Sequence, residues 1–283
     1  MSADLQSGNP AGTATSPDRD RRRAVLVLGG IAALIIVLLV GLVAFLLGVG
    51  TDDPGPGAGA PPARPPATVP LDEGGWDVAA QTELATRPML QLPESAALPH
   101  PLTTETAGPP IELPEPGNTA GQLVAGGFPG TPEGAVAQLI ELTRVGLEGG
   151  DPEGYRLAYE SVAAPGAPAV ESTRIYRDLQ QIRAGTGLPP SGAVAGLMFS
   201  WSPTSALIKG TTDDGRYVVA CVLGELVTGL NGQAVSTGAG SCQALRRVDD
   251  QWRISPGAAA SAASLAWPGT AEAVQAGYRD LIR

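Results

Sequence analysis

The stretch GGFPGTPEGAVAQLIEL, residues 126–142, decides the fold because a complete helix-start signal appears there after a long segment without a sustained hydrophobic period. Thr131 is a residue type that caps helix N-termini. Pro132 suits the first helical position, where no N–H is needed, and Glu133 favours the positive end of the helix dipole. The stretch therefore predicts a helix that begins directly after Thr131.

Two more helices are predicted downstream. The first helix carries apolar residues at a period near 3.6 and ends before Gly149 and Gly150. Asp151, Pro152 and Glu153 repeat the start signal for a second, shorter helix. The third helix places apolar residues at i, i+4 and i+7, namely Ile175, Leu179 and Ile182. The chain thus predicts three helices before any strand.

The pattern then changes to short runs rich in β-branched and aromatic residues. These runs are AGLMFSWS, SALIKGTT, RYVVACVLGELV, SCQALRRV and QWRIS, and they predict an antiparallel meander. Asp213, Asp214 and Gly215 supply a tight turn, and the glycine-rich residues 228–241 are expected to form a flexible loop. Helices followed by strands indicate an α+β domain over residues 126–283, with helices packed on a curved, cone-like antiparallel sheet. Residues 270–283 are expected to close the chain as a helix.

The chain has two cysteines, which lie in the predicted sheet. Cys221 falls inside the longest strand and Cys242 at the start of the next. Two cysteines in an extracytoplasmic domain predict a disulfide, which would contribute on the order of 3 kcal/mol by loop-closure entropy. The alternative is a pair of buried free thiols.

Residues 24–49 form an apolar run of 26 residues without a charge. At about 1.5 Å per residue it is long enough to span a hydrocarbon core of about 30 Å, so it predicts a transmembrane helix. The alternative, a cleaved secretory signal, usually has a shorter apolar region. Residues 1–23, which precede the run, contain Arg19, Arg21, Arg22 and Arg23, whereas Asp52 and Asp53 follow it. The positive-inside rule places the N-terminus in the cytoplasm and the rest outside, as a single-pass protein of the cell membrane.

Two segments separate this span from the predicted domain. Residues 50–70 are almost entirely Pro, Gly, Ala and Thr, which predicts a linker without a core of its own. Residues 71–125 carry apolar anchors, Trp76 among them, between many prolines that forbid long helices. We expect an extended arm, parts of which lie against the domain, with a short helix possible over residues 77–86.

A search for catalytic chemistry finds no recognisable motif. The only histidine, His100, lies among prolines, so neither a histidine-based nucleophile nor a metal site is expected, and no cofactor is indicated. Two carboxylate pairs, Asp213 with Asp214 and Asp249 with Asp250, are typical of turns. Six arginines would form either a positive patch or solvated faces: Arg174, Arg177, Arg183, Arg246, Arg247 and Arg253. The net charge of −10 argues against direct nucleic acid binding.

Residues 98–256 resemble a group of single-span membrane proteins of conjugative and integrative elements in high-GC Gram-positive bacteria. The resemblance rests on GFPGTPEGAVAQL at residues 127–139, QWRIS at residues 251–255, and LP followed by TAGP in the arm (Leu98, Pro99, Thr106, Ala107, Gly108 and Pro109). Members usually show a variant of GFxxTPxGA, often with Arg before Thr-Pro, where this chain has Gly130. The resemblance implies an extracytoplasmic domain of the nuclear transport factor 2-like type, similar to the bitopic assembly factors of type IV secretion channels.

The resemblance and the single span together imply a non-enzymatic scaffold of a DNA or protein transfer apparatus. Expected partners are channel or ATPase subunits, membrane lipid through residues 24–49, and further copies of the chain. The alternative is a membrane-anchored ligand-binding or sensing domain with an apolar pocket. Five residues are candidates for lining that pocket, unless they are ordinary core residues: Met198, Phe199, Trp201, Tyr217 and Trp252.

Overall fold

The computed structural model describes residues 74–283. The expected cytoplasmic tail at residues 1–23, transmembrane helix at 24–49 and linker at 50–70 lie outside the described residues, as do the first three residues of the expected arm. No helix within residues 74–283 combines the length and the apolarity that crossing a bilayer requires.

The three helices predicted before the meander are present. Helix α3 spans Pro132–Leu147, and the Thr131 side chain caps it by accepting a hydrogen bond of 3.2 Å from the Gly134 N–H. Helix α4 spans Pro152–Val162 with Asp151 as its cap, and α5 spans Arg174–Gly185 with Thr173 as its cap. Two 3₁₀ turns, η2 at Glu148–Gly150 and η3 at Val170–Ser172, precede α4 and α5. The local start signals therefore act as the sequence predicts.

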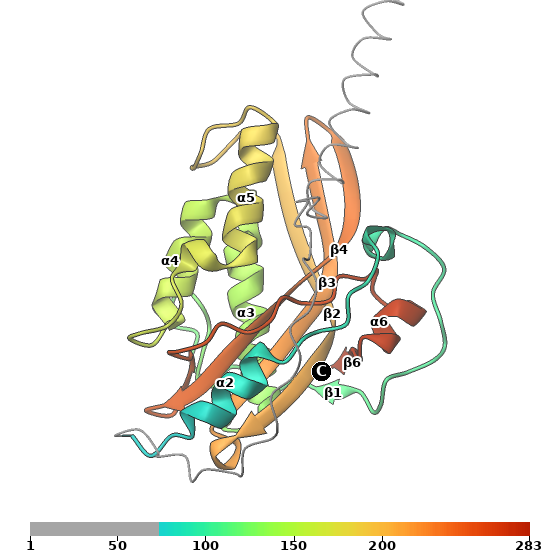
Figure 1. The fold of residues 1–283 in the computed structure, drawn as a ribbon. Helices are drawn as coiled ribbons and strands as arrows, with labels where there is room; N and C mark the ends of the chain where they lie inside the picture. The colour runs from blue at the N-terminus through green and yellow to red at the C-terminus, as the bar shows by residue number, and fades with distance from the viewer. Residues whose placement is uncertain (1–73) are drawn as a thin grey trace, which may run out of the picture. The chain divides into compact units, whose positions relative to one another are not determined.

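A six-stranded sheet has the order β1-β6-β2-β3-β4-β5. Its strands are antiparallel neighbours except β1 and β6, which pair in parallel. Figure 1 shows the three long central strands running the height of the domain beside the helices. The strand bounds are Ile111–Glu112 for β1, Leu197–Thr212 for β2, Tyr217–Leu230 for β3, Gln233–Val248 for β4, Gln251–Ile254 for β5 and Arg279–Ile282 for β6.

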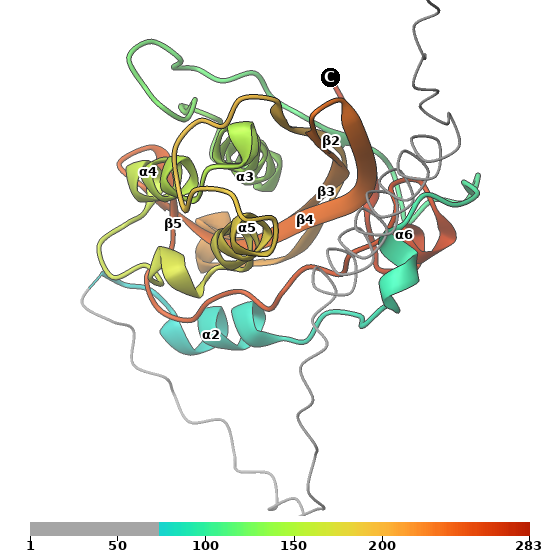
Figure 2. The ribbon, with the colours of Figure 1, turned by 90° about the horizontal axis from the view of Figure 1, so that it is seen from above.

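The sheet curls around α3, and α4 and α5 lie beside that helix (Figure 2). Helix α3 is buried on nearly every side, including Val136, Leu139 and Ile140, each at most 2% exposed. The prediction of an α+β domain with helices packed on a curved antiparallel sheet is confirmed for residues 74–283.

Both faces of the curled sheet are covered. In β3 the residues that face α3, such as Val218 and Val222, and those on the outer face, such as Val219 and Leu223, are all fully buried. The outer face packs against helix α2, Val78–Thr86, and against the C-terminal segment that contains α6, Ala271–Gln275. The core therefore has two apolar layers, one on each side of the sheet.

Residues 74–125, expected to be an extended arm, build part of this outer layer. They contain α2, within the range where a short helix was expected, the 3₁₀ turn η1 at Glu94–Ala97, and β1. The start of α2 is held by Asp213, whose carboxylate accepts hydrogen bonds from the Asp77 N–H (2.8 Å) and from Gln81 Nε2 (2.7 Å). The Trp76 ring lies 4.3 Å and 4.2 Å from the guanidinium carbons of Arg216 and Arg246. These contacts tie the arm to the sheet.

Residues 228–241 are not the flexible loop that their glycines suggested. Strands β3 and β4 pair continuously up to Leu230 and Gln233, so only Asn231 and Gly232 form the turn. Both turn residues have positive φ, 53° and 84°. Asn-Gly is the dipeptide that favours such a two-residue hairpin turn. The hairpin continues to its tip because pairing satisfies the backbone groups that a loop would leave to water.

The runs AGLMFSWS and SALIKGTT belong to one strand, β2, although Pro203 lies between them. A register shift between Pro203 and Ser205 interrupts the pairing with β3 there. On its other edge β2 pairs with β6 only at Ser205 and Ala206. A proline is tolerated at such a bulge because its missing N–H breaks few ladder bonds.

The closing helix expected over residues 270–283 is wrong beyond Gln275. Helix α6 stops there, Gly277 has φ of +91°, and Arg279–Ile282 forms β6. Tyr278 is 3% exposed and donates a hydrogen bond of 3.0 Å to the Ser264 carbonyl. Pairing of the final residues with β2 and β1 outweighs the local helical pattern.

Candidate functional site

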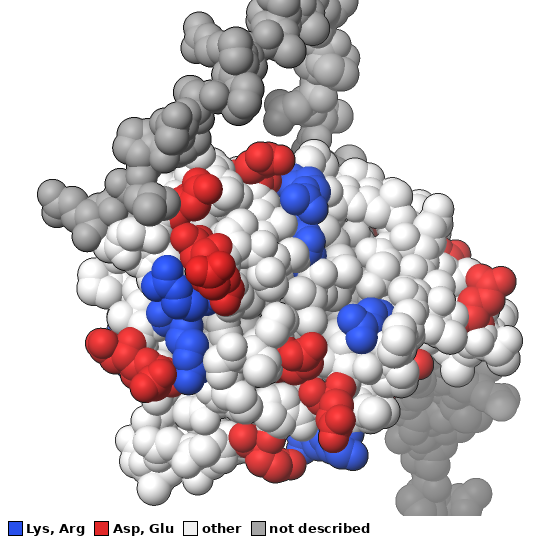
Figure 3. Space-filling model, turned by 90° about the horizontal axis from the view of Figure 1, so that it is seen from below, with Lys and Arg blue, Asp and Glu red and all other residues white. Residues whose placement is uncertain are grey.

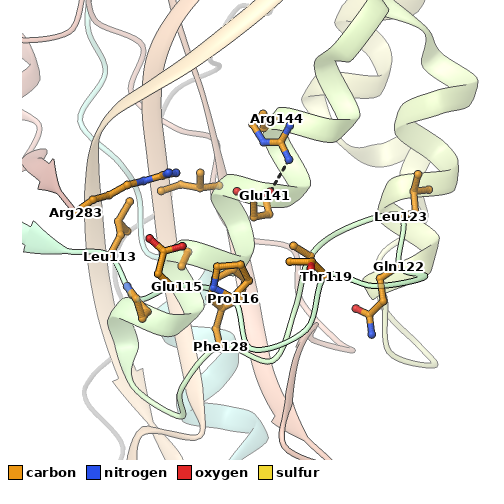
Figure 4. A pocket seen from close by; sticks show the side chains of 14 residues that line it. Leu113, Glu115, Pro116, Thr119, Gln122, Leu123, Phe128, Glu141, Arg144 and Arg283 are labelled. Atoms are coloured by element: carbon orange, nitrogen blue, oxygen red, sulfur yellow. Dashed lines mark hydrogen bonds and ion pairs between the residues drawn. The ribbon is translucent and has the colours of Figure 1, made fainter.

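A cavity of about 340 Å³ opens between α3, the segment 113–128 and the C-terminal residue Arg283. We call it the α3 groove. In Figure 4 the lining side chains come from these three parts of the chain, with Arg283 reaching in from the end of the last strand. Because its walls come from residues far apart in the chain, no local motif indicated it.

The α3 groove joins an apolar floor to a charged rim. Phe128 and Ile140 are each 2% exposed, whereas Leu123 on the rim is 54% exposed. Glu141 accepts a hydrogen bond of 2.7 Å from Arg144, which raises the pKa of the Arg144 guanidinium above its usual value. The groove can therefore receive an apolar side chain while offering both signs of charge beside it.

The five residues predicted to line an apolar pocket are divided between the two faces of the sheet. Tyr217 lies on the outer face of the sheet and donates a hydrogen bond of 3.2 Å to the Gln81 carbonyl. Phe199, Trp201 and Trp252 are buried on the face toward the helices, and Met198 is 46% exposed. The strand register separates them because neighbouring residues of a strand point to opposite faces.

The two predicted cysteines form the expected disulfide. Cys221 and Cys242 are directly opposite one another in the β3–β4 ladder and are bonded. Both side chains lie on the outer face, in an apolar cluster with Met89, Leu223 and Tyr278. The bond therefore joins the two central strands underneath the C-terminal segment.

The six arginines considered as a positive patch do not share one surface. Arg183 is 1% exposed and donates hydrogen bonds of 2.7 to 2.9 Å to three backbone carbonyls, those of Gly150, Pro189 and Gly192. Arg246 is 8% exposed and donates to Gln81 Oε1 at 2.6 Å. These two guanidinium groups therefore donate hydrogen bonds to polar atoms inside the fold and do not form part of a surface patch. On the face drawn in Figure 3, basic side chains are scattered among acidic ones.

The two carboxylate pairs occupy turns, as their residue types indicated. Asp213, Asp214, Asp249 and Asp250 all have positive φ, between 47° and 57°. Asp and Asn adopt this conformation more readily than other residues with a side chain. Among residues 74–283, no three His, Cys, Asp or Glu side chains lie close enough together to hold a metal ion.

His100 joins the arm to α6. Its Nε2 lies 3.0 Å from Glu272 Oε2 and its Nδ1 lies 2.6 Å from the Leu98 carbonyl oxygen. With an acceptor at each ring nitrogen, the imidazolium form is favoured. The hydrogen bond to Glu272 and then that to Leu98 raise the pKa of His100 above 6.5, and the same pair lowers the pKa of Glu272 below 4.5.

The His100–Glu272 pair predicts a pH-dependent contribution to stability. The raised pKa of His100 makes its contribution complete below pH 6.5 and lost as the pH rises through the folded-state pKa. The lowered pKa of Glu272 makes its contribution complete above pH 4.5 and lost as the pH falls further. We expect the melting temperature of His100→Gln to fall below that of the unsubstituted chain at about pH 5.5 and to approach it at about pH 8.5. A difference that is equal at both pH values would contradict this.

Comparison of the chain with protein-family models, with curated proteins and with solved structures finds no match.

Proposed function

We propose that this chain is a non-enzymatic, single-pass membrane scaffold or assembly component of a conjugative, type IV-like DNA or protein transfer apparatus. Three features support a domain outside the cytoplasm: the apolar run at residues 24–49, the arginines before it, and the Cys221–Cys242 disulfide. Disulfides persist in oxidising compartments and are rare in the cytosol.

The observation that carries a docking role is that the inside of the curled sheet is already filled. Helix α3 occupies it, and Phe199, Trp201 and Trp252 are at most 8% exposed there. A Cβ added at Gly150 would lie 2.6 Å from the Phe199 ring, so little room remains beside that ring. The α3 groove, by contrast, opens on the surface of the molecule and combines an exposed leucine with charged groups. Apolar anchors with a polar rim are the usual composition of protein interfaces.

Crosslinking in intact cells tests this proposal. Amine-directed reagents are a poor choice, because the chain's only lysine, Lys209, donates hydrogen bonds to the Ala85 carbonyl at 3.0 Å and to the Arg87 carbonyl. A photoreactive amino acid at position 123 reports on the α3 groove. The same amino acid at position 157, where Leu157 is 48% exposed on α4, is the matched control.

Partner recovery should depend on Leu123. We expect Leu123→Arg to reduce co-purification of a membrane ATPase or multi-span channel subunit by about tenfold or more, because an apolar anchor would be replaced by a charge. Leu157→Arg, equally exposed on another surface, should leave recovery unchanged. Partners would be identified after purification in mild detergent through a C-terminal tag.

Two results would count against the proposal. Crosslinks at position 123 that contain no membrane-protein partner would remove the docking role from the α3 groove. Recovery of the chain alone, with a melting temperature that rises on addition of lipid extract, would favour the ligand-binding or sensing function instead.

A further inference from the structure

A second cavity, of about 180 Å³, lies between the first turn of α5, strand β4 and the segment 259–263. It shares no residue with the α3 groove. Its wall on the α5 side carries Ser172, Thr173, Arg174 and Arg177, and its wall on the β4 side carries Ser241 and Gln243. We call it the α5–β4 pocket.

The β4 wall presents two buried polar side chains. Ser241 and Gln243 pair with Val222 and Ala220 of β3, so both face the helices, while Cys242 between them faces the other way into the disulfide. Ser241 is 8% exposed and Gln243 is 9% exposed. Within residues 74–283 no hydrogen bond joins the Ser241 hydroxyl or the Gln243 amide to another group of the protein. Neither group is among the fully buried polar atoms that lack a partner, so the polar atoms of Ser241 and Gln243 are open to the pocket, where a ligand can reach them.

The α5 wall is suited to a negative charge. The N-terminus of this 12-residue helix carries the partial positive charge of its dipole. Arg177 lines the pocket and donates from its Nε to the Thr173 carbonyl at 3.4 Å. Its two terminal nitrogens carry further N–H donors. Arg174, which also lines the pocket, pairs with Asp178 at 3.2 Å.

From these two walls we infer that the α5–β4 pocket binds a small organic anion, a carboxylate or a phosphate ester, with its oxyanion toward α5 and Arg177. Ser241 and Gln243 complete its hydrogen bonds from the opposite side. The rest of the lining includes Tyr159, Pro168 and alanines of the segment 259–263, which suits a short apolar part. The volume admits a group of a few heavy atoms and excludes a nucleotide, since a water molecule alone takes about 30 Å³ of liquid volume.

Thermal unfolding of the full-length chain in a non-ionic detergent tests this inference. The probes are propionate, glycerol 3-phosphate and inorganic phosphate, each compared with chloride at equal ionic strength. A ligand that binds the folded state raises the melting temperature in proportion to the logarithm of its concentration above Kd. A larger shift with propionate identifies a carboxylate site, and a larger shift with glycerol 3-phosphate identifies a phosphate-ester site.

Two variants and a control separate binding from folding. Arg177→Gln should weaken binding of the active probe by about tenfold or more, because it removes a charged donor. Gln243→Leu should abolish the probe-dependent shift without lowering the melting temperature measured without probe, because the Gln243 amide makes no hydrogen bond within residues 74–283 that the substitution would break. Arg156→Gln, on the exposed face of α4, should retain the full shift.

Three results would overturn the inference. The first is that no organic probe raises the melting temperature above the chloride reference. The second is that Arg177→Gln binds the probe as tightly as Arg156→Gln does. The third is that Gln243→Leu retains the probe-dependent shift. A shift with inorganic phosphate alone would equally contradict an organic ligand. None of these outcomes depends on whether partners are recovered through the α3 groove.

Discussion

Replacement of Trp252 by alanine is expected to lower the free energy of unfolding by about 3–5 kcal/mol, the usual cost of deleting a buried tryptophan side chain. Trp252 is 1% exposed and lies in β5, where the sheet meets the start of α3. Its Nε1 donates a hydrogen bond of 2.8 Å to the Pro129 carbonyl, and an added Cβ on Gly134 would lie 3.2 Å from the same nitrogen. Such close contacts leave the neighbours little freedom to collapse into the cavity.

Urea unfolding followed by circular dichroism, in matched detergent, measures this effect. Trp252→Phe keeps much of the packing and removes the hydrogen bond to Pro129, so it should lie between the unsubstituted chain and the alanine variant. Met198→Ala, at a residue that is 46% exposed, is the control and should change stability by no more than about 0.5 kcal/mol. A loss below about 1 kcal/mol for Trp252→Ala would contradict its place in the core.

Removal of the disulfide should cost about 3 kcal/mol, because the cysteines are 21 residues apart and their bond limits the unfolded chain. The double variant Cys221→Ser, Cys242→Ser leaves no thiol that could mispair. Its hydroxyl groups also enter an apolar cluster in which Cys221 is fully buried, which adds to the loss.

Reductant provides the internal control for the disulfide. The unsubstituted chain should lose stability when reductant is added, whereas the double serine variant should not respond. Equal stability of the double variant and the oxidised chain would show that the strand pairing alone holds β3 to β4. Thiol labelling of protein taken directly from cells would test whether the bond forms in the native compartment.

Much of the fold could be predicted from local features of the chain. Thr131, Asp151 and the apolar spacing of Ile175, Leu179 and Ile182 correctly indicated α3, α4 and α5. The continuous apolar run around Cys221 indicated a central strand, and the compartment argument paired that cysteine with Cys242. These features work because capping and hydrophobic periodicity act within a few residues.

The two errors in the strands have different causes. Glycines in residues 228–241 suggested a loop, but Asn231 and Gly232 confine the turn to two residues and the rest pairs along the hairpin. Residues 279–282 had a helical pattern, but β2 and β1 supply pairing partners that a helix could not use. Neither partner strand is near these residues in the chain.

The candidate sites were harder to predict than the fold. The candidates for an apolar pocket are divided by strand register, which places Tyr217 and Trp252 on opposite faces of the sheet. The α3 groove joins residues 113–128 to α3 and Arg283, and the α5–β4 pocket joins α5 to residues 259–263. Patterns along the sequence do not show which distant segments will pack against one another.

The sequence by itself determined where α3 and α4 begin, that a third helix follows them, where the central strands lie, and which cysteines pair. Only the tertiary structure decided that both faces of the sheet are covered, that Arg183 and Arg246 are buried donors and not surface charges, and where the cavities open. The physical reason is the distance along the chain between the groups that interact. Caps, turns and periodicity are satisfied by neighbours in the chain, whereas burial and cavities depend on which distant segments pack together.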